Sequence, residues 1–147
     1  MVEQMISESV RIKCEVVTAD EKEGDLRRIL NFGHTIGHAL ESETQYTRFL
    51  HGEAVSFGMT AATHLAQSTD LLDKPTAGRV HEAINMYGPI PSTAGIEAKN
   101  LLARLAKDKK TIQGSVHFVL PTGIGSVTIT SGIPEDKVLA AITAALA

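Results

Sequence analysis

The chain has 147 residues, of which 43% are hydrophobic and 21% charged, so it is long enough to bury the core of one ordered domain. Its formal net charge of −3 gives no basic field for nucleic acid, and its apolar runs are too short to cross a bilayer. The single cysteine, Cys14, excludes a disulfide within the chain and suits a reducing cytoplasm, where we expect the protein to act.

Residues 2–17 are expected to form an amphipathic helix. Lys13 falls on its apolar face, where a lysine either extends its aliphatic stem toward water or holds its charge against an anionic ligand. The residues alone leave both interpretations open. The charged stretch 19–25 that follows contains Gly24 and is typical of a loop. The apolar face is defined by side chains three or four residues apart: Val2, Met5, Ile6, Val10, Cys14 and Val17.

Residues 26–40 are expected to form one helix that carries the functional site. Gly33 and Gly37 lie inside it, and a glycine there costs about 1 kcal/mol relative to alanine. The two glycines therefore indicate a neighbouring backbone or a ligand at close range, or else a kinked helix. One face of the helix is wholly polar, with residues three or four apart: Arg27, Asn31, His34 and His38.

A second helix is predicted to begin at His51, after a polar link over residues 41–48, and to pack antiparallel to the first. His51 would then face His34 or His38, and three such imidazoles can converge on a zinc ion. The sequence HTIGH lacks the glutamate that zinc peptidases carry after the first histidine. Glu41 either orients an imidazole from behind or is an ordinary exposed helix charge.

The rest of the chain predicts further helices and one β-hairpin. Strands are expected at 116–120 and 126–130, and His64, His81 and His117 are expected to be structural. The predicted fold is therefore mainly α with one small β-hairpin, in a single domain over residues 1–147. The further helices are expected at 73–87, about 97–106, and from Pro134 to the end.

Long motifs in this chain resemble 3-dehydroquinate synthase, the NAD-dependent sugar-phosphate cyclase of the shikimate pathway. LRRILNFGHTIGHALE (26–41) and LHGEAVSFGM (50–59) resemble its zinc-binding segment. The resemblance extends through IKCEVVTADEKEGDLR (12–27) and AKDKKTIQGSVHFVLPTGIG (106–125), and so covers nearly the whole chain. Cyclases that make valiolone or scyllo-inosose share much of this pattern. The resemblance implies the C-terminal helical domain of the dehydroquinate synthase-like fold.

The resemblance also implies a role for individual residues. His34 and His51 correspond to ligands of zinc or another divalent metal, and Glu23 and His38 correspond to catalytic groups. The third zinc ligand of the family is a glutamate that would precede Met1. NAD is bound mainly by an N-terminal dinucleotide-binding domain, and no glycine-rich pattern of that kind occurs in this chain. The residues implied to bind substrate are Lys13, Arg27, Asn31, and one of Lys109 and Lys110.

The reaction implied is the cyclisation of 3-deoxy-D-arabino-heptulosonate 7-phosphate to 3-dehydroquinate with elimination of phosphate, a carbon–oxygen lyase step in aromatic amino acid biosynthesis. Lysine and arginine suit a substrate with a carboxylate at one end and a phosphate at the other. We expect this chain to supply one wall of the site, to be inactive alone, and to form a homodimer within the full enzyme. The alternatives are a non-catalytic helical module for binding or dimerisation, and the same domain of a related cyclase.

Overall fold

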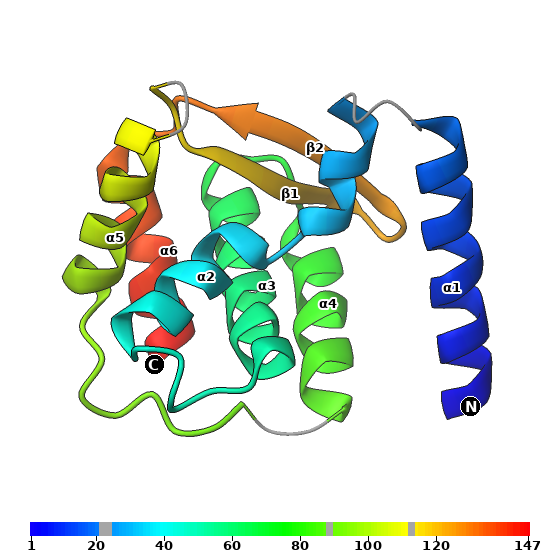
Figure 1. The fold of residues 1–147 in the computed structure, drawn as a ribbon, viewed down its shortest axis with the longest axis horizontal. Coiled ribbons are helices and arrows are strands. Elements are labelled where there is room, and N and C mark those ends of the chain that lie inside the picture. The colour runs from blue at the N-terminus through cyan, green and yellow to red at the C-terminus, as the bar shows by residue number, and fades with distance from the viewer. Residues whose placement is uncertain (21–24, 88–89, 112–113) are drawn as a thin grey trace.

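The computed structural model describes residues 1–20, 25–87, 90–111 and 114–147, which form seven helices and one two-stranded antiparallel sheet. The β-hairpin lies across one end of the main helices, and α1 stands at the edge of the molecule (Figure 1). This confirms the mainly α prediction. In chain order the elements are α1 (Val2–Ala19), the 3-10 helix η1 (Asp25–Asn31), α2 (His34–Glu43), α3 (His51–Ser68), α4 (Lys74–Met86), α5 (Ala98–Thr111), β1 (His117–Gly123), β2 (Ser126–Ser131) and α6 (Glu135–Leu146).

Local side-chain chemistry sets several of these boundaries. The Glu53 carboxylate accepts the Leu50 backbone N–H at 2.7 Å and caps the start of α3. At α4 the Asp73 carboxylate accepts the Thr76 backbone N–H at 2.8 Å. Two elements are longer than predicted. Helix α5 continues to Thr111, and strand β1 continues through the turn-like residues to Gly123.

The hydrophobic core is built around α3, which contacts α2, α4, α6 and β1. Small residues fill most of this helix, so its neighbours approach closely. No helix in the described ranges is long and apolar enough to cross a membrane. The largest fully buried apolar side chains come from five elements: Phe57 and Leu65 from α3, Ile36 and Leu40 from α2, Leu101 from α5, Leu120 from β1 and Ile142 from α6.

The backbones of α2 and α3 cross at three glycines. A Cβ on Gly58 would fall on the Gly33 carbonyl oxygen and 2.7 Å from the Gly37 amide nitrogen. A Cβ on Gly37 would lie 2.8 Å from the Ala54 carbonyl oxygen. Residue 33 of the first segment therefore contacts residue 58 of α3, and residue 37 contacts residue 54. The numbering falls along α3 as it rises along α2, which is the antiparallel packing expected. The glycines serve a close backbone neighbour, one of the three explanations that the sequence offered.

Residues 26–40 are not one continuous helix, so that prediction is wrong. The 3-10 helix η1 ends at Asn31, and α2 starts at His34 after Gly33, whose φ is +82°. Glycine adopts this left-handed conformation without the cost that a side chain would incur. The break arises because the Gly33 backbone turns away against α3, where an added Cβ would lie 2.6 Å from the Val55 carbonyl oxygen.

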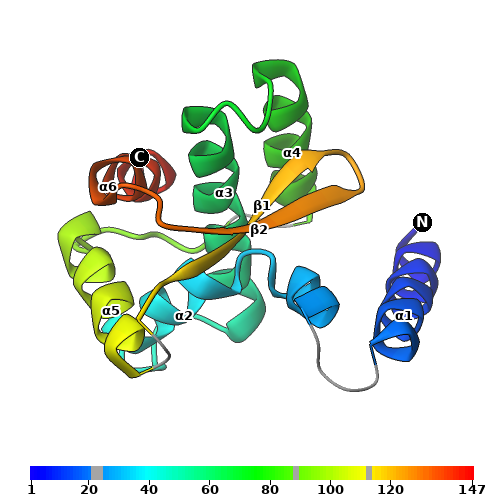
Figure 2. The same cartoon turned by 90° about the horizontal axis from the view of Figure 1, so that it is seen from above.

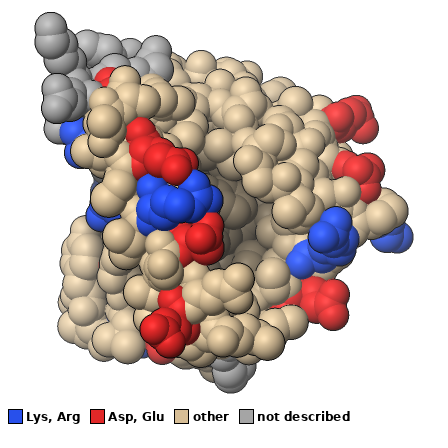
Figure 3. Space-filling view, turned by 90° about the vertical axis from the view of Figure 1, so that its right-hand side faces the viewer, with Lys and Arg blue, Asp and Glu red and all other residues tan. Residues whose placement is uncertain are grey.

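Helix α1 lies apart from the core. It has no fully buried residue, and η1 is the element it contacts most. Figure 2 shows the separation between α1 and the other helices from above. The side of the molecule where α1 lies has a hollow with charged side chains on both sides (Figure 3). Its predicted apolar face is exposed for most of its length, with Ile6 at 60% and Val10 at 57% exposure.

We expect Gly58→Ala to lower the free energy of unfolding by about 1–3 kcal/mol, because the new methyl group meets backbone atoms that cannot rotate away. Gly78→Ala in α4 is the matched control, since an added Cβ there meets no atom within 4 Å. That control should be stabilised by up to about 1 kcal/mol through helix propensity. Urea unfolding of both variants measures the difference. Equal stability of Gly58→Ala and the parent would contradict the close crossing.

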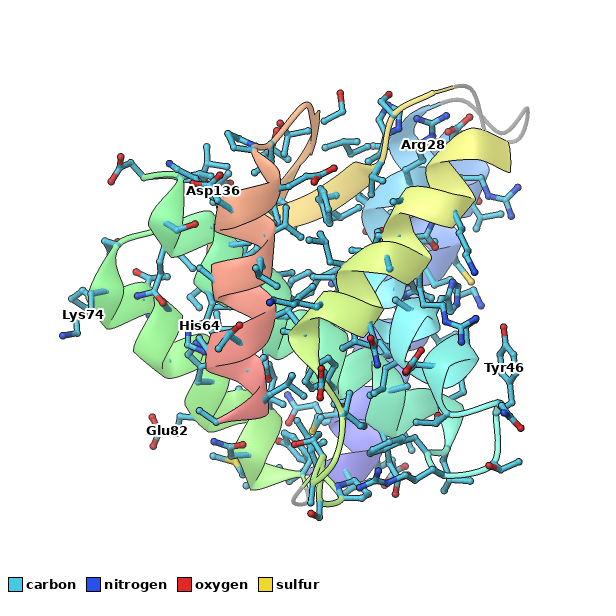
Figure 4. The ribbon with its side chains drawn as sticks, turned by 90° about the vertical axis from the view of Figure 1, so that its left-hand side faces the viewer. Arg28, Tyr46, His64, Lys74, Glu82 and Asp136 are labelled. Carbon is cyan, nitrogen blue, oxygen red and sulfur yellow. The ribbon has the colours of Figure 1, made fainter. Side chains whose placement is uncertain are left out.

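His64 of α3 (Figure 4) and His81 of α4 pair with each other, with ring centroids 4.5 Å apart. His81 Nε2 is buried and has no hydrogen-bond partner among the described residues. Burial lowers the pKa of both imidazoles, and the charge of His64 lowers the pKa of His81 further. The expectation that these histidines are structural holds, and they form a neutral contact between two helices.

Acid should weaken this contact. Because both folded-state pKa values lie below 6.5, the contribution to stability is complete above that value and is lost as the pH falls toward the folded pKa. Urea midpoints at pH 7.5 and about pH 5 should therefore differ more for the parent than for a His64→Gln, His81→Leu double variant. A His117→Gln variant, changed at an exposed histidine, should keep the parent's pH dependence. Equal dependence in parent and double variant would contradict the assignment.

Candidate functional site

Three histidines meet where α2 and α3 begin. His34 is the first residue of α2, His38 lies one turn later, and His51 is the first residue of α3. The ring centroid of His34 is 5.5 Å from those of His38 and His51, and the His38 and His51 centroids are 5.8 Å apart. His51 therefore faces both imidazoles, as the sequence predicted. The side chains of His38 and His51 are 53% and 60% exposed, so a ligand can reach them.

The buried carboxylate of Glu41 contacts this histidine cluster. Glu41 is only 7% exposed, and its Oε1 accepts a hydrogen bond from His51 Nδ1 at 3.0 Å. Its Oε2 lies 3.9 Å from His38 Nε2. Of the two interpretations that the sequence left open, the structure supports the one in which Glu41 orients an imidazole, and the imidazole is that of His51.

The donor atoms of this cluster fit a divalent metal. His34 Nδ1 lies 3.3 Å from the Phe32 carbonyl oxygen, so a hydrogen bond there leaves its Nε2 lone pair available. The bond to Glu41 does the same for His51. Among the described residues, the group whose donor atoms all lie within 4.8 Å of one another is His38, Glu41 and His51, and it does not include His34. Imidazole and carboxylate groups are both common zinc ligands.

A cavity of about 310 Å³ opens beside the histidines. Two of the predicted site residues, Asn31 and His38, line it. The Thr35 hydroxyl donates to the His117 carbonyl oxygen at 3.0 Å, which holds β1 against α2 and forms one side of the cavity. The other residues of the wall are Arg28, Leu105, Ser115, Val116, Val119 and Ile129.

Arg28 lines the cavity (Figure 4), whereas Arg27, the arginine singled out from the sequence, does not. The cause is the 3-10 geometry of η1, in which residues three apart share a face. Arg28 and Asn31 are three apart, while Arg27 and Asn31 would share a face only in an α-helix. The backbone N–H of the half-buried Arg27 donates to Asp20 Oδ2 at 3.0 Å.

Other predicted site residues lie elsewhere. Lys13 is exposed on α1, outside the set of residues that line the cavity. Glu23 falls outside the described residues. Lys109 and Lys110 lie within α5, but their side chains are outside what the structure describes. Sequence reasoning missed Arg28 and Thr35 as wall residues and treated His117 as merely structural. All three lie within the quoted motifs, but their place in the cavity wall depends on the 3-10 turn and on the α2–β1 contact.

Comparison with known proteins identifies the family to which this chain belongs. The family model described as "3-dehydroquinate synthase C-terminal" matches residues 1–111, three quarters of the chain. The chain belongs to this family. All the candidate residues named from the motifs fall within the matched range.

Curated relatives carry the same name. The chain is 60% identical over 146 residues to the 3-dehydroquinate synthase of Solibacter usitatus and 48% identical over 142 residues to that of Koribacter versatilis. These alignments cover 99% and 97% of this chain but 41% and 38% of the relatives. The chain thus spans about two fifths of the length of the synthases it matches.

Solved structures of cyclases share the fold. A 2-epi-5-epi-valiolone synthase from Streptomyces hygroscopicus, with NAD+ and Zn2+ bound, matches with a TM-score of 0.81 and 26% identity, over 97% of this chain and 39% of that one. A 2-deoxy-scyllo-inosose synthase, complexed with carbaglucose-6-phosphate, NAD+ and Co2+, matches with a TM-score of 0.78 and 22% identity, over 95% of this chain and 40% of that one. The second likeness concerns the fold alone.

Proposed function

We propose that this chain is the metal- and substrate-binding part of a 3-dehydroquinate synthase, which cyclises 3-deoxy-D-arabino-heptulosonate 7-phosphate to 3-dehydroquinate and releases phosphate. The observation that carries this proposal is the meeting of His34, His38 and His51 beside a cavity of about 310 Å³, in a chain of this family. The identities of 60% and 48% to synthases of that name favour this substrate over those of the valiolone cyclases, at 26%.

We assign the proposed roles of the three histidines from the exposed nitrogen atoms of their rings. His34 and His51 would hold a zinc ion together with a further ligand from the rest of the full protein, and zinc bound there would supply a Lewis acid for a substrate hydroxyl. His38 would exchange a proton with substrate, and its position in the cavity wall without a close hydrogen bond to Glu41 supports this role. Asn31 hydrogen-bonds the substrate from the cavity wall.

Cationic groups are proposed to bind the two ends of the substrate. Arg28 adds a guanidinium to the cavity wall, and its planar fork suits a carboxylate or a phosphate. The roles of Lys13, Arg27 and Glu23, and of Lys109 or Lys110, remain predictions from the family motifs. NAD is proposed to bind mainly to the N-terminal region that the longer relatives possess.

We also propose that α1 docks that N-terminal region. The chain matches about two fifths of its relatives, and the matched model is C-terminal, so the full protein has another part to pack against it. The exposed apolar face of α1 is a suitable contact. The opposite face is polar and internally paired, since Arg11 bonds Glu8 and Glu15 at 2.7 and 2.6 Å.

Zinc binding tests the metal assignment. In a calorimetric titration we expect the parent chain to bind zinc, and His34→Ala and His51→Ala each to weaken binding by more than the roughly 10–100-fold that loss of an outer-sphere contact costs. His64→Gln is the control, since this imidazole pairs with His81 and lies outside the three-ring cluster and the cavity wall. Unchanged binding in both ligand variants would contradict the assignment.

Complementation tests the activity. We expect the chain to be inactive alone, and to release phosphate from the keto-acid phosphate substrate once the N-terminal region of the Solibacter usitatus synthase is co-expressed with it. Ile6→Glu with Val10→Glu should abolish the complex because both side chains lie on the exposed apolar face of α1. Gln4→Glu, on the opposite face together with Glu8, Arg11 and Glu15, should leave the complex and the rate unchanged.

Each result of this assay has a distinct meaning. A stable, folded complex that releases no phosphate from the keto-acid phosphate would contradict the proposed synthase. Turnover only of a sugar phosphate that lacks the carboxylate would assign the chain to a related cyclase. A complex that survives the double glutamate variant would place the docking surface elsewhere than on α1.

A further inference from the structure

Glu41 occupies a position that costs free energy unless another group compensates for it. It lies in the last turn of α2, where the helix dipole disfavours a negative charge, and it is only 7% exposed. A buried carboxylate needs hydrogen-bond donors or a cationic partner. The short contact in the structure is to His51 Nδ1, at 3.0 Å. The carboxylate and that ring nitrogen therefore depend on each other.

This contact determines which nitrogen of His51 carries the hydrogen. An ionised carboxylate only accepts hydrogen bonds, so Nδ1 must be the donor, and in the neutral ring Nε2 then keeps its lone pair. The same logic applies to His34, whose Nδ1 lies 3.3 Å from the Phe32 carbonyl oxygen, another pure acceptor. In free histidine the neutral ring favours the opposite form, with hydrogen on Nε2, so the protein has to impose this tautomer.

His38 differs from its two neighbours in this respect. Its Nε2 lies 3.9 Å from Glu41 Oε2, which is too long for a hydrogen bond. The described contacts therefore fix the tautomer of two histidines and leave the third unrestrained. That division matches two rings that hold a metal and one that exchanges a proton.

We propose that Glu41 is a positioning residue: it holds His51 as the Nδ1–H tautomer before any metal arrives, so that Nε2 of His51 and Nε2 of His34 are both ready to donate to a metal ion. If the grouping of His38, Glu41 and His51 held the metal through His51 Nδ1, the metal would replace the hydrogen that Nδ1 donates to Glu41. The part of this inference that concerns metal binding rests on the proposed function. The part that concerns the tautomer of His51 does not.

The zinc-free chain tests the tautomer directly. Long-range ¹H–¹⁵N spectra of labelled histidine side chains, recorded about two pH units above the ordinary imidazole pKa, distinguish Nδ1–H from Nε2–H. We expect His51 to be Nδ1–H in the parent and to become mainly Nε2–H in Glu41→Ala. Glu43→Gln is the matched control, because Glu43 also lies near the end of α2 but bonds Asn100 and Arg104 of α5. That variant should leave the His51 signals unchanged.

Two outcomes would overturn the tautomer assignment. One is a parent spectrum in which His51 carries its hydrogen on Nε2, which needs no variant and so does not depend on whether Glu41→Ala folds. The other is a folded Glu41→Ala variant whose His51 remains Nδ1–H, since Glu41 would then not be the cause. Glu41→Gln should retain part of the Nδ1–H form, because the amide oxygen still accepts a hydrogen bond.

Zinc then separates positioning from ligation. In the zinc-loaded parent, His51 should keep its Nδ1 hydrogen and bind through Nε2, and Glu41→Ala should weaken zinc binding by about 10–100-fold. Loss of the Nδ1 hydrogen on adding zinc would instead mean that His51 binds the metal through Nδ1, and would overturn the positioning role. If the parent does not bind zinc at all, the metal assignment under the proposed function fails, while the zinc-free spectra still decide the tautomer.

Discussion

The close crossing of α2 and α3 is the constraint on which the site depends. Gly33, Gly37 and Gly58 remove the side chains that would hold the two backbones apart. His51, at the start of α3, is thereby brought to 5.5 Å from His34, at the start of α2. With an ordinary helix separation of 8–10 Å the rings would lie farther apart and Glu41 would lose its hydrogen bond. The geometry of the histidines is therefore set by backbone packing rather than by contacts among the rings.

The sequence predicted the elements that depend on local signals. The apolar periodicity of residues 2–17 located α1, and the resumption of the pattern at His51 located the start of α3. Pro134 and the Asp73–Thr76 segment marked the beginnings of α6 and α4 because capping chemistry acts within a few residues. The antiparallel helix pair also predicted that His51 faces His34 or His38, and its ring lies 5.5 Å from the first and 5.8 Å from the second.

What the sequence could not predict depends on contacts between distant segments. From the apolar periodicity, one helix was predicted to continue through Gly33. The periodicity could not reveal the break, because the positive φ of Gly33 results from its contact with α3 and not from the neighbouring residues. The error had a second consequence, since a 3-10 turn presents Arg28 beside Asn31 where an α-helix would present Arg27. Glu41 was ambiguous for a similar reason. Glu41 follows His38 by three residues, so the sequence places both on one face of the helix. Only the packing of α3 decides that this face is buried at Glu41.

The core and the candidate site use different side chains of the same helices. Apolar burial is concentrated along α3 and its neighbours, whereas the side chains of His38 and His51 are 53% and 60% exposed and His38 lines the cavity. The contacts that orient His34 and His51 come from Phe32 and Glu41, both within the chain. The exposed face of α1, by contrast, has no counterpart among the described residues that buries it. Under the proposed function, docking the N-terminal region would complete the ligand set and cover α1 without having to rebuild the histidine cluster. In that proposal the helical part would keep its metal-facing geometry, and cofactor binding would fall to the rest of the protein.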